Sequence, residues 1–108
     1  MSESKLRSQS MDFAVSIINL VKVLKEKRES IISNQIGRSS TSIGANIHEA
    51  PYAQGTKDFI SKFEIALQEC SEAEGWLQLL FNANDMDEEA YKKQMQATKA
   101  VNSWEKII

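Results

Sequence analysis

The residues of this chain that could carry out chemistry are few. They are the only histidine, His48, the only cysteine, Cys70, and two carboxylates three residues apart, Glu69 and Glu72. A histidine near a cysteine could activate a thiolate nucleophile, and two carboxylates on one helix face could act as general acid and base. A metal site at His48 is the third chemical hypothesis.

The metal hypothesis fails on the number and spacing of the ligands. Glu49 follows His48, but di-metal sites in bundles use Glu-x-x-His pairs on two helices, and this sequence has no such pair. Zinc sites need more ligands than one His and one Cys. The sequence also lacks a glycine-rich phosphate loop and a nucleophile elbow. We therefore predict no metal ion and no cofactor.

The positions of Cys70, Glu69 and Glu72 argue against catalysis as well. Cys70 falls on the apolar face of a predicted helix, where a cysteine behaves as a small buried hydrophobic residue. An antiparallel helix hairpin that turns near residue 55 would place Arg38 opposite the two carboxylates. The planar fork of an arginine can hold a carboxylate through two bonds. We predict a structural ion pair of Arg38 with Glu69 or Glu72, and no enzymatic activity.

Hydrophobic spacing predicts four amphipathic helices and no strand. In the first helix the predicted buried stripe consists of Leu6, Phe13, Ala14, Ile17, Ile18, Val21 and Leu24. The predicted helices are Glu3–Lys27, a second helix that ends near Ala53, Lys57–Ala83, and a fourth from Glu88 to the end of the chain. Four helices with short links favour an all-α, up-down-up-down four-helix bundle, in a single domain of residues 1–108.

Capping residues mark the links between these helices. Ser30 and Ser33 are alternative N-caps for the second helix. Gly55 suits a helix C-cap, and Thr56 is the predicted N-cap of the third helix. Asp87 is the predicted N-cap of the fourth helix, with acidic residues following it in the first turn.

Composition limits the compartment and the partners. The single proline, Pro51, either ends the second helix or bends its last turn, and four glycines are too few for a turn-rich β fold. A lone cysteine excludes an intramolecular disulfide, and we see neither a signal peptide nor the ~18 consecutive apolar residues of a membrane span. We expect a cytoplasmic protein with no membrane partner. Its net charge of −2 lacks the basic excess of a dedicated nucleic-acid binder.

The stretch Arg38–Ala50 has a helical pattern but is built from small and polar residues. Ser42, Gly44 and Ala45 are the residues predicted to let neighbouring helices pack closely. Asn46 could set register or oligomeric state as a buried polar residue, or it could be a partly solvated amide with no special role. Asn46 and Glu49 complete the polar network predicted for Arg38, Glu69 and Glu72.

Two groups of basic residues are candidate nucleic-acid contacts. They are Lys22, Lys25, Lys27 and Arg28 near the end of the first helix, and Lys92 and Lys93 in the fourth helix. The first group can be explained without a nucleic acid: positive charges are favourable at the carboxyl end of a helix, and these side chains would lie on a solvated face. We favour that explanation over phosphate contacts because Glu26 and Glu29 lie among these cations.

Several motifs, taken together, resemble one protein family. They are Ser42–Ile47, Glu49–Ala50, Lys57–Lys62, Ile65–Leu67, Glu69, Glu72 and Trp76–Leu80. Over about Phe13–Met86 the chain resembles the bacterial 23S rRNA intervening-sequence protein family, also called the S23-type family. It is more distantly similar to the accessory protein of diversity-generating retroelements. Family members often have a glycine where Ser40 stands and an acidic residue where His48 stands.

The resemblance implies a small cytoplasmic bundle that assembles as a ring-like homo-oligomer, typically a pentamer, without catalytic residues. The retroelement relatives bind nucleic acid and a reverse transcriptase, but they are strongly basic and this chain is not. One functional hypothesis is a non-enzymatic homo-oligomeric interaction or scaffold protein, with Trp76, Phe81 and Trp104 as candidate interface anchors. The alternative is an RNA-associated accessory protein whose basic patches are repeated around the ring.

Overall fold

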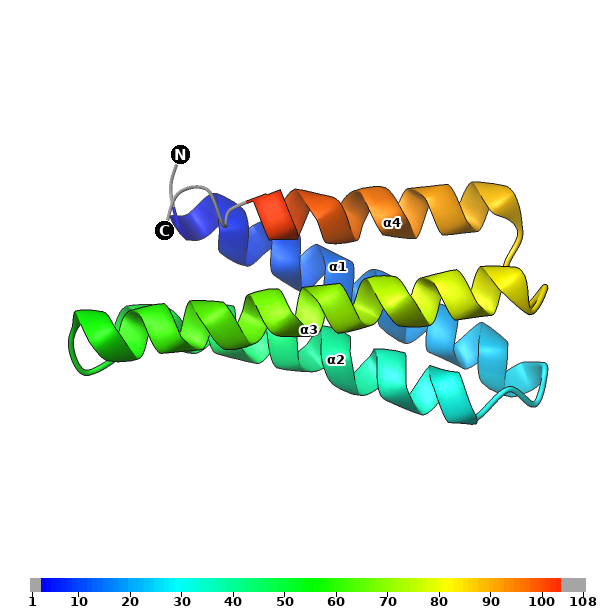
Figure 1. Ribbon diagram of the computed structural model, residues 1–108, viewed down its shortest axis with the longest axis horizontal. Coiled ribbons are helices and arrows are strands. Elements are labelled where there is room, and N and C mark those ends of the chain that lie inside the picture. Colours follow the sequence, from blue (N-terminus) through cyan, green and yellow to red (C-terminus); the bar gives the residue numbers. More distant parts are fainter. Residues whose placement is uncertain (1–2, 104–108) are drawn as a thin grey trace.

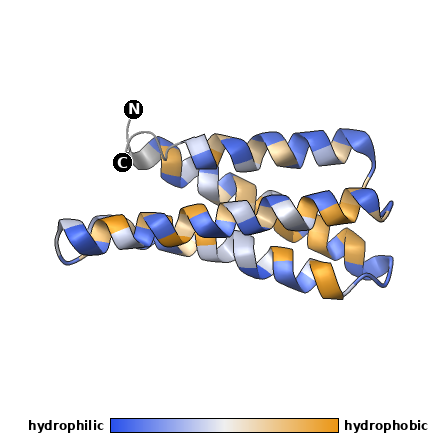
Figure 2. Ribbon diagram, viewed as in Figure 1, coloured by the Kyte–Doolittle hydropathy of each residue, from blue (hydrophilic) through white to orange (hydrophobic). Residues whose placement is uncertain are grey.

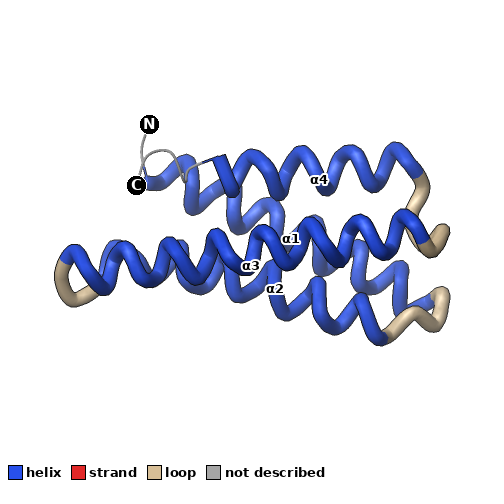
Figure 3. The backbone as a smooth tube through the Cα atoms, in the orientation of Figure 1, coloured by secondary structure: helices blue, strands red, loops and turns tan. Residues whose placement is uncertain are grey.

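A computed structural model describes residues 3–103, and within that range the chain is helical with no strand. The helices are α1 (Glu3–Glu26), α2 (Ile31–Glu49), α3 (Thr56–Asn82) and α4 (Glu88–Asn102), and a short 3-10 helix, η1 (Ala50–Tyr52), follows α2. Figures 1 and 3 show the α1–α2 and α3–α4 links at one end of the bundle and the α2–α3 turn at the other. The all-α, up-down-up-down four-helix bundle predicted from the sequence is thus confirmed.

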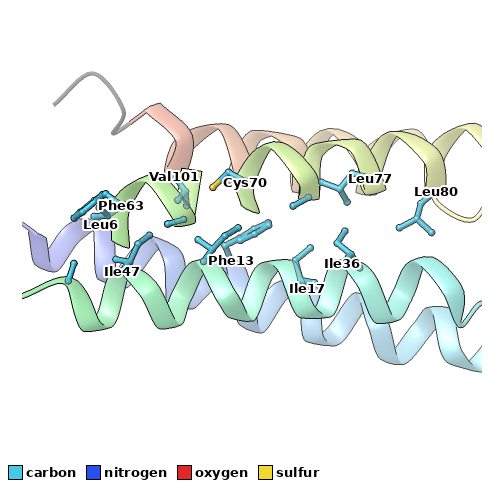
Figure 4. Close-up of a cluster of buried hydrophobic side chains, with 14 of the residues drawn as sticks. Leu6, Phe13, Ile17, Ile36, Ile47, Phe63, Cys70, Leu77, Leu80 and Val101 are labelled. Atoms are coloured by element: carbon cyan, nitrogen blue, oxygen red, sulfur yellow. The ribbon is translucent and has the colours of Figure 1, made fainter. Parts of the chain in front are cut away.

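Each helix packs on two neighbours around a shared core. The contacts join α1 to α2, α2 to α3, α3 to α4 and α4 to α1, so α1 lies diagonally across the bundle from α3. Figure 4 shows side chains from all four helices pointing into the space between them. Fully buried residues include Phe13, Ile17, Ile36, Leu77 and Val101. Burial of these three- and four-spaced apolar faces is the main force that holds the bundle together.

The buried stripe predicted for α1 is correct except at one position. Ile18 is 40% exposed, whereas Ile17 beside it is fully buried. Successive residues lie about 100° apart around a helix, and at this point Ile17 faces the core while Ile18 is turned toward the outer side. Ile18 lies with Met11 and Val15 on the outer face of α1, where all three are exposed.

The start of α2 differs from the prediction. Ser30 occupies the N-cap position, but its side chain makes no capping hydrogen bond. The carboxylate of Glu29 instead accepts hydrogen bonds from the backbone N–H groups of Ile32, at 2.9 Å, and Ser33, at 2.7 Å. The Ser33 hydroxyl donates to the Glu29 carbonyl oxygen at 2.9 Å. A longer side chain one residue earlier therefore satisfies two of the free N–H groups of the helix.

Two boundaries predicted near the α2–α3 turn are also wrong. The α-helix ends at Glu49, earlier than the predicted Ala53, and continues as η1, with Pro51 in its first turn. Proline has no N–H to donate to an α-helical hydrogen bond, which explains the change. The N-cap position of α3 belongs to Gly55, with φ of 91°, and Thr56 is already helical. That left-handed backbone conformation favours glycine, so the predicted role of Thr56 as N-cap is wrong.

The start of α4 is as predicted, and its inner face holds an unexpected polar residue. The Asp87 carboxylate accepts a hydrogen bond from the Ala90 N–H at 2.8 Å. Gln94 is only 8% exposed and faces α1, where its Nε2 donates to the Ser16 hydroxyl at 2.5 Å. The visible side of α4 is largely hydrophilic in Figure 2. Two of its three buried residues, Gln94 and Thr98, are polar, whereas the six buried residues of α3 are all apolar, so α4 contributes less apolar surface to the core than α3 does.

Candidate functional site

The polar cluster on the α2–α3 hairpin is centred on Arg38. Its Nη1 donates to Glu69 Oε2 at 3.0 Å, and its Nη2 donates to Glu72 Oε1. The Trp76 indole N–H donates to the same Glu72 oxygen at 3.4 Å. The contact expected from the sequence is present, and it involves both carboxylates. The two terminal nitrogens of one guanidinium thus bridge two acids one turn apart on α3.

The electrostatics of the cluster stabilise its charged form. Loss of solvent lowers the pKa of the Arg38 guanidinium, but attraction by Glu69 and the hydrogen bond to Glu72 outweigh that effect, so the pKa is raised above its ordinary value. Arg38 therefore stays positively charged, and its charge is compensated by the two carboxylates. The cluster therefore joins α2 to α3 through ion pairs.

A second ion pair lies further along the same hairpin. Lys62 Nζ on α3 lies 3.7 Å from Glu49 Oε2 on α2. Both this pair and the Arg38 pairs match an antiparallel arrangement in which partner residue numbers sum to between 107 and 111. Asn46, between them, donates only within α2, to the Ser42 carbonyl at 2.9 Å and the Ser42 hydroxyl at 3.3 Å. The structure therefore places Glu49 in the hairpin contact and Asn46 beside it, bonded to its own helix.

The three residues predicted to allow close packing have different environments. Gly44 is buried, and a Cβ added there would lie 3.9 Å from the Met11 sulfur on α1. Ser42 is half-buried, and Ala45 is exposed. The prediction is therefore wrong for Ala45, because that residue lies on the outer side of α2.

Three buried serines of α2 lie outside the set of residues that were predicted to allow close packing. Ser33, Ser39 and Ser40 are fully buried. Their hydroxyls are satisfied locally: Ser40 donates to the Gly37 carbonyl at 3.2 Å, and Ser39 accepts from Arg38 at 3.2 Å. Their three- and four-residue spacing from the buried isoleucines indicates that they lie on the same buried face. Because serine is polar, that position was not recognised from the sequence.

Neither His48 nor Cys70 is placed for nucleophilic catalysis. Cys70 is fully buried and points into the core in Figure 4. Burial, with a smaller contribution from nearby carboxylates, raises the pKa of the Cys70 thiol to about 12, so the reactive thiolate is disfavoured. His48 is exposed, and its Nδ1 lies 3.1 Å from Nη2 of Arg7 on α1. His48 and Cys70, which were considered and rejected as a catalytic pair, thus have separate structural surroundings.

The candidate nucleic-acid contacts lie on the surface. Lys22, Lys25, Lys27, Arg28, Lys92 and Lys93 are all exposed. Lys92 forms an ion pair with Glu88 at 2.9 Å, one turn away on α4. Within residues 3–103 the other five make no ion pair. Over the same residues no group of three or more His, Cys, Asp or Glu gathers as metal ligands, and no helix has the length and hydrophobicity to cross a membrane.

The aromatic residues predicted as interface anchors are engaged within the protomer. Trp76 is half-buried, packs against the core and bonds Glu72. Phe81 stacks on Tyr91 of α4, with ring centroids 4.5 Å apart. Trp104 lies outside the residues that the structure describes. The large apolar side chains that remain exposed on α1 are not aromatic, and one of them, Ile18, had been assigned to the core from the sequence.

The fold and the polar cluster define an antiparallel four-helix bundle whose central hairpin is joined by ion pairs. A family model described as 23S rRNA-intervening sequence protein matches residues 2–104. The chain belongs to this family, as its motifs indicated.

A solved structure extends the comparison. A crystal structure of a protein of unknown function from the S23 ribosomal protein family of Bacteroides thetaiotaomicron superposes with a TM-score of 0.92 at 42% sequence identity. The match covers 95% of this chain and 93% of that one. No curated protein matches the chain.

Proposed function

We propose that this chain is a non-enzymatic subunit of a cytoplasmic homo-oligomer, a ring-like scaffold on which other macromolecules assemble. The observation that carries the proposal is the α1 stripe, which we define as Met11, Val15 and Ile18. These side chains are 52%, 55% and 40% exposed, although each is large and apolar. Single exposed apolar residues are common on protein surfaces, but a continuous group of them marks an interaction surface.

The α1 stripe is continuous because of its spacing. Its members are separated by four and three residues, so they lie on successive turns of one helix face. Val15 lies about 160° around the helix from both Phe13 and Ile17, which are buried in the core. It therefore points away from the protomer, and no rearrangement of the bundle is needed for a partner to cover it.

A second subunit is the partner that family membership supports. The resemblance to the S23-type family implies a ring, typically a pentamer, and a domain of this size gains buried surface by oligomerising. The Arg38, Glu69 and Glu72 side chains are engaged in ion pairs with one another, and the Cys70 thiol is buried. These features favour assembly over chemistry.

The test measures the mass of the assembly in solution. We expect sedimentation velocity and light scattering at micromolar concentration to give an oligomer, five times the protomer mass of 12.2 kDa if the ring is a pentamer. Val15→Asp should reduce that mass, because a charge would be buried at the interface. Ile31→Asp is the matched control, since Ile31 is 79% exposed and lies outside the stripe. A monomeric wild-type protein would refute the proposal.

A second candidate function, RNA association, is favoured by the basic group at the end of α1. Lys22, Lys25, Lys27 and Arg28 are exposed and make no ion pair within residues 3–103. A ring would repeat this group once per subunit, which would raise the local charge density. Binding of this kind should weaken steeply with salt concentration and with the Lys25→Glu substitution. RNA retention that is absent or independent of salt would exclude it.

A further inference from the structure

We infer that the subunits join head to tail, with the α1 stripe of one copy seated on the outer face of α3 of the next. We define the α3 outer face as Gln68, Ser71, Gly75 and Leu79. This inference rests on the proposed homo-oligomer and specifies its two contact surfaces. Head-to-tail contacts use two different patches of one protomer and lead to rings or filaments, whereas an isologous contact uses one patch twice and leads to a closed dimer.

The two faces lie on opposite sides of the protomer. Helix α1 contacts α2 and α4, and α3 contacts the same two helices, so α1 and α3 are diagonal in the bundle. Figure 1 shows the same arrangement, with α3 in front and α1 passing behind. Gly75 stands midway in sequence between the buried residues Ala73 and Leu77, and Val15 has the same relation to its buried neighbours Phe13 and Ile17. The two faces therefore point outward in opposite directions.

The shape of the α3 outer face suits a large apolar side chain. Gly75 lies in the interior of α3, two turns before its end, where glycine is an unfavourable residue. A Cβ added at Gly75 would meet no atom within 4 Å, so nothing inside the protomer requires a glycine there. Leu79, one turn along, is 48% exposed. A low point beside an exposed leucine can receive a side chain such as Val15 from a neighbouring copy.

The charges of the two helices are complementary. Helix α1 has four basic and three acidic residues, and Lys27 and Arg28 follow it directly, whereas α3 has two basic and five acidic residues. The α1 side of the protomer is therefore net positive and the α3 side net negative, although the whole chain carries only −2. Complementary charge favours contact between unlike faces and disfavours contact of the α1 stripe with itself.

A mixing experiment tests the inference with variants that damage one face each. Val15→Asp removes the α1 stripe and leaves the α3 outer face intact, and Leu79→Asp does the reverse. Each variant alone should sediment as a monomer. An equimolar mixture should form a one-to-one heterodimer and nothing larger, because only one intact pair of faces remains. Gly75→Leu should also prevent assembly of the otherwise wild-type protein, and its helix propensity is higher than that of glycine, so unfolding would not explain the loss.

The outcomes separate this inference from the proposed function. If wild-type protein is oligomeric but Leu79→Asp and Gly75→Leu assemble normally, the inference is wrong and the homo-oligomer stands. If neither single variant regains a partner in the mixture, head-to-tail contact between these faces is also excluded. A monomeric wild-type protein overturns both. Circular dichroism of every variant, with Ile31→Asp as control, verifies that the bundle is folded in each case.

Discussion

Replacing Gln94 by methionine should stabilise the protein, because the oxygen of its side-chain amide is buried without a hydrogen-bond donor. The Gln94 side chain lies between α4 and α1, where Nε2 bonds the Ser16 hydroxyl. Its Oε1 is inaccessible to solvent and accepts no hydrogen bond from any residue between 3 and 103. Methionine has nearly the same length and a similar helix propensity, and it places an apolar group where the amide lies.

The expected magnitude follows from two opposing contributions. Relief of a buried, unpaired polar atom is worth about 1–3 kcal/mol, and loss of the bond to Ser16 costs about 0.5–1.5 kcal/mol. The Ser16 hydroxyl is only half-buried, so water can replace the lost partner. The net stabilisation should be about 1 kcal/mol, equivalent to a rise in Tm of about 4 °C for a domain of this size.

Urea titration and thermal unfolding at one fixed protein concentration would measure the effect, since oligomerisation makes Tm depend on concentration. Gln96→Met is the matched control: it makes the same chemical change on the exposed side of α4 and should leave stability nearly unchanged. A loss of about 1 kcal/mol or more for Gln94→Met would refute the reasoning. It would mean that Oε1 has a partner, such as a bound water or a group on another subunit.

Three further predictions concern Cys70, Arg38 and Asp87. Burial raises the pKa of the Cys70 thiol to about 12, while the thiol of the unfolded chain ionises near pH ~8.5. The stability that comes from the neutral thiol should therefore be fully present below pH ~8.5 and fall as the pH rises toward 12. Cys70→Ser should flatten this alkaline part of a curve of stability against pH. Arg38→Met should lower Tm by leaving two carboxylates in repulsion, and the deficit should shrink in molar salt; a salt-independent deficit would assign it to packing. Asp87→Ala removes the bond to the Ala90 N–H and should cost about 1 kcal/mol in a urea titration, whereas an unchanged midpoint would show that this cap contributes nothing.

Hydrophobic spacing and turn signals were enough to predict the four helices, their order and the register of the central hairpin. Apolar residues at three- and four-residue spacing specify helices whatever surrounds them, because that spacing places them on one face. A short link at Gly55 makes α2 and α3 antiparallel, so counting from the turn was enough to place Arg38 opposite Glu69 and Glu72. Local rules also found the cap at Asp87.

Which residues of each helix face are buried depends on how the four helices pack against one another. Ile17 and Ile18 are equivalent by type, but the positions of α2 and α4 bury the first and expose the second. Ser39 and Ser40 are buried because the helices approach closely there, which a rule that places polar residues outside cannot anticipate. The α1 stripe and the opposite α3 outer face follow from the same cause: burial depends on the arrangement of four helices together, and periodicity describes one helix at a time.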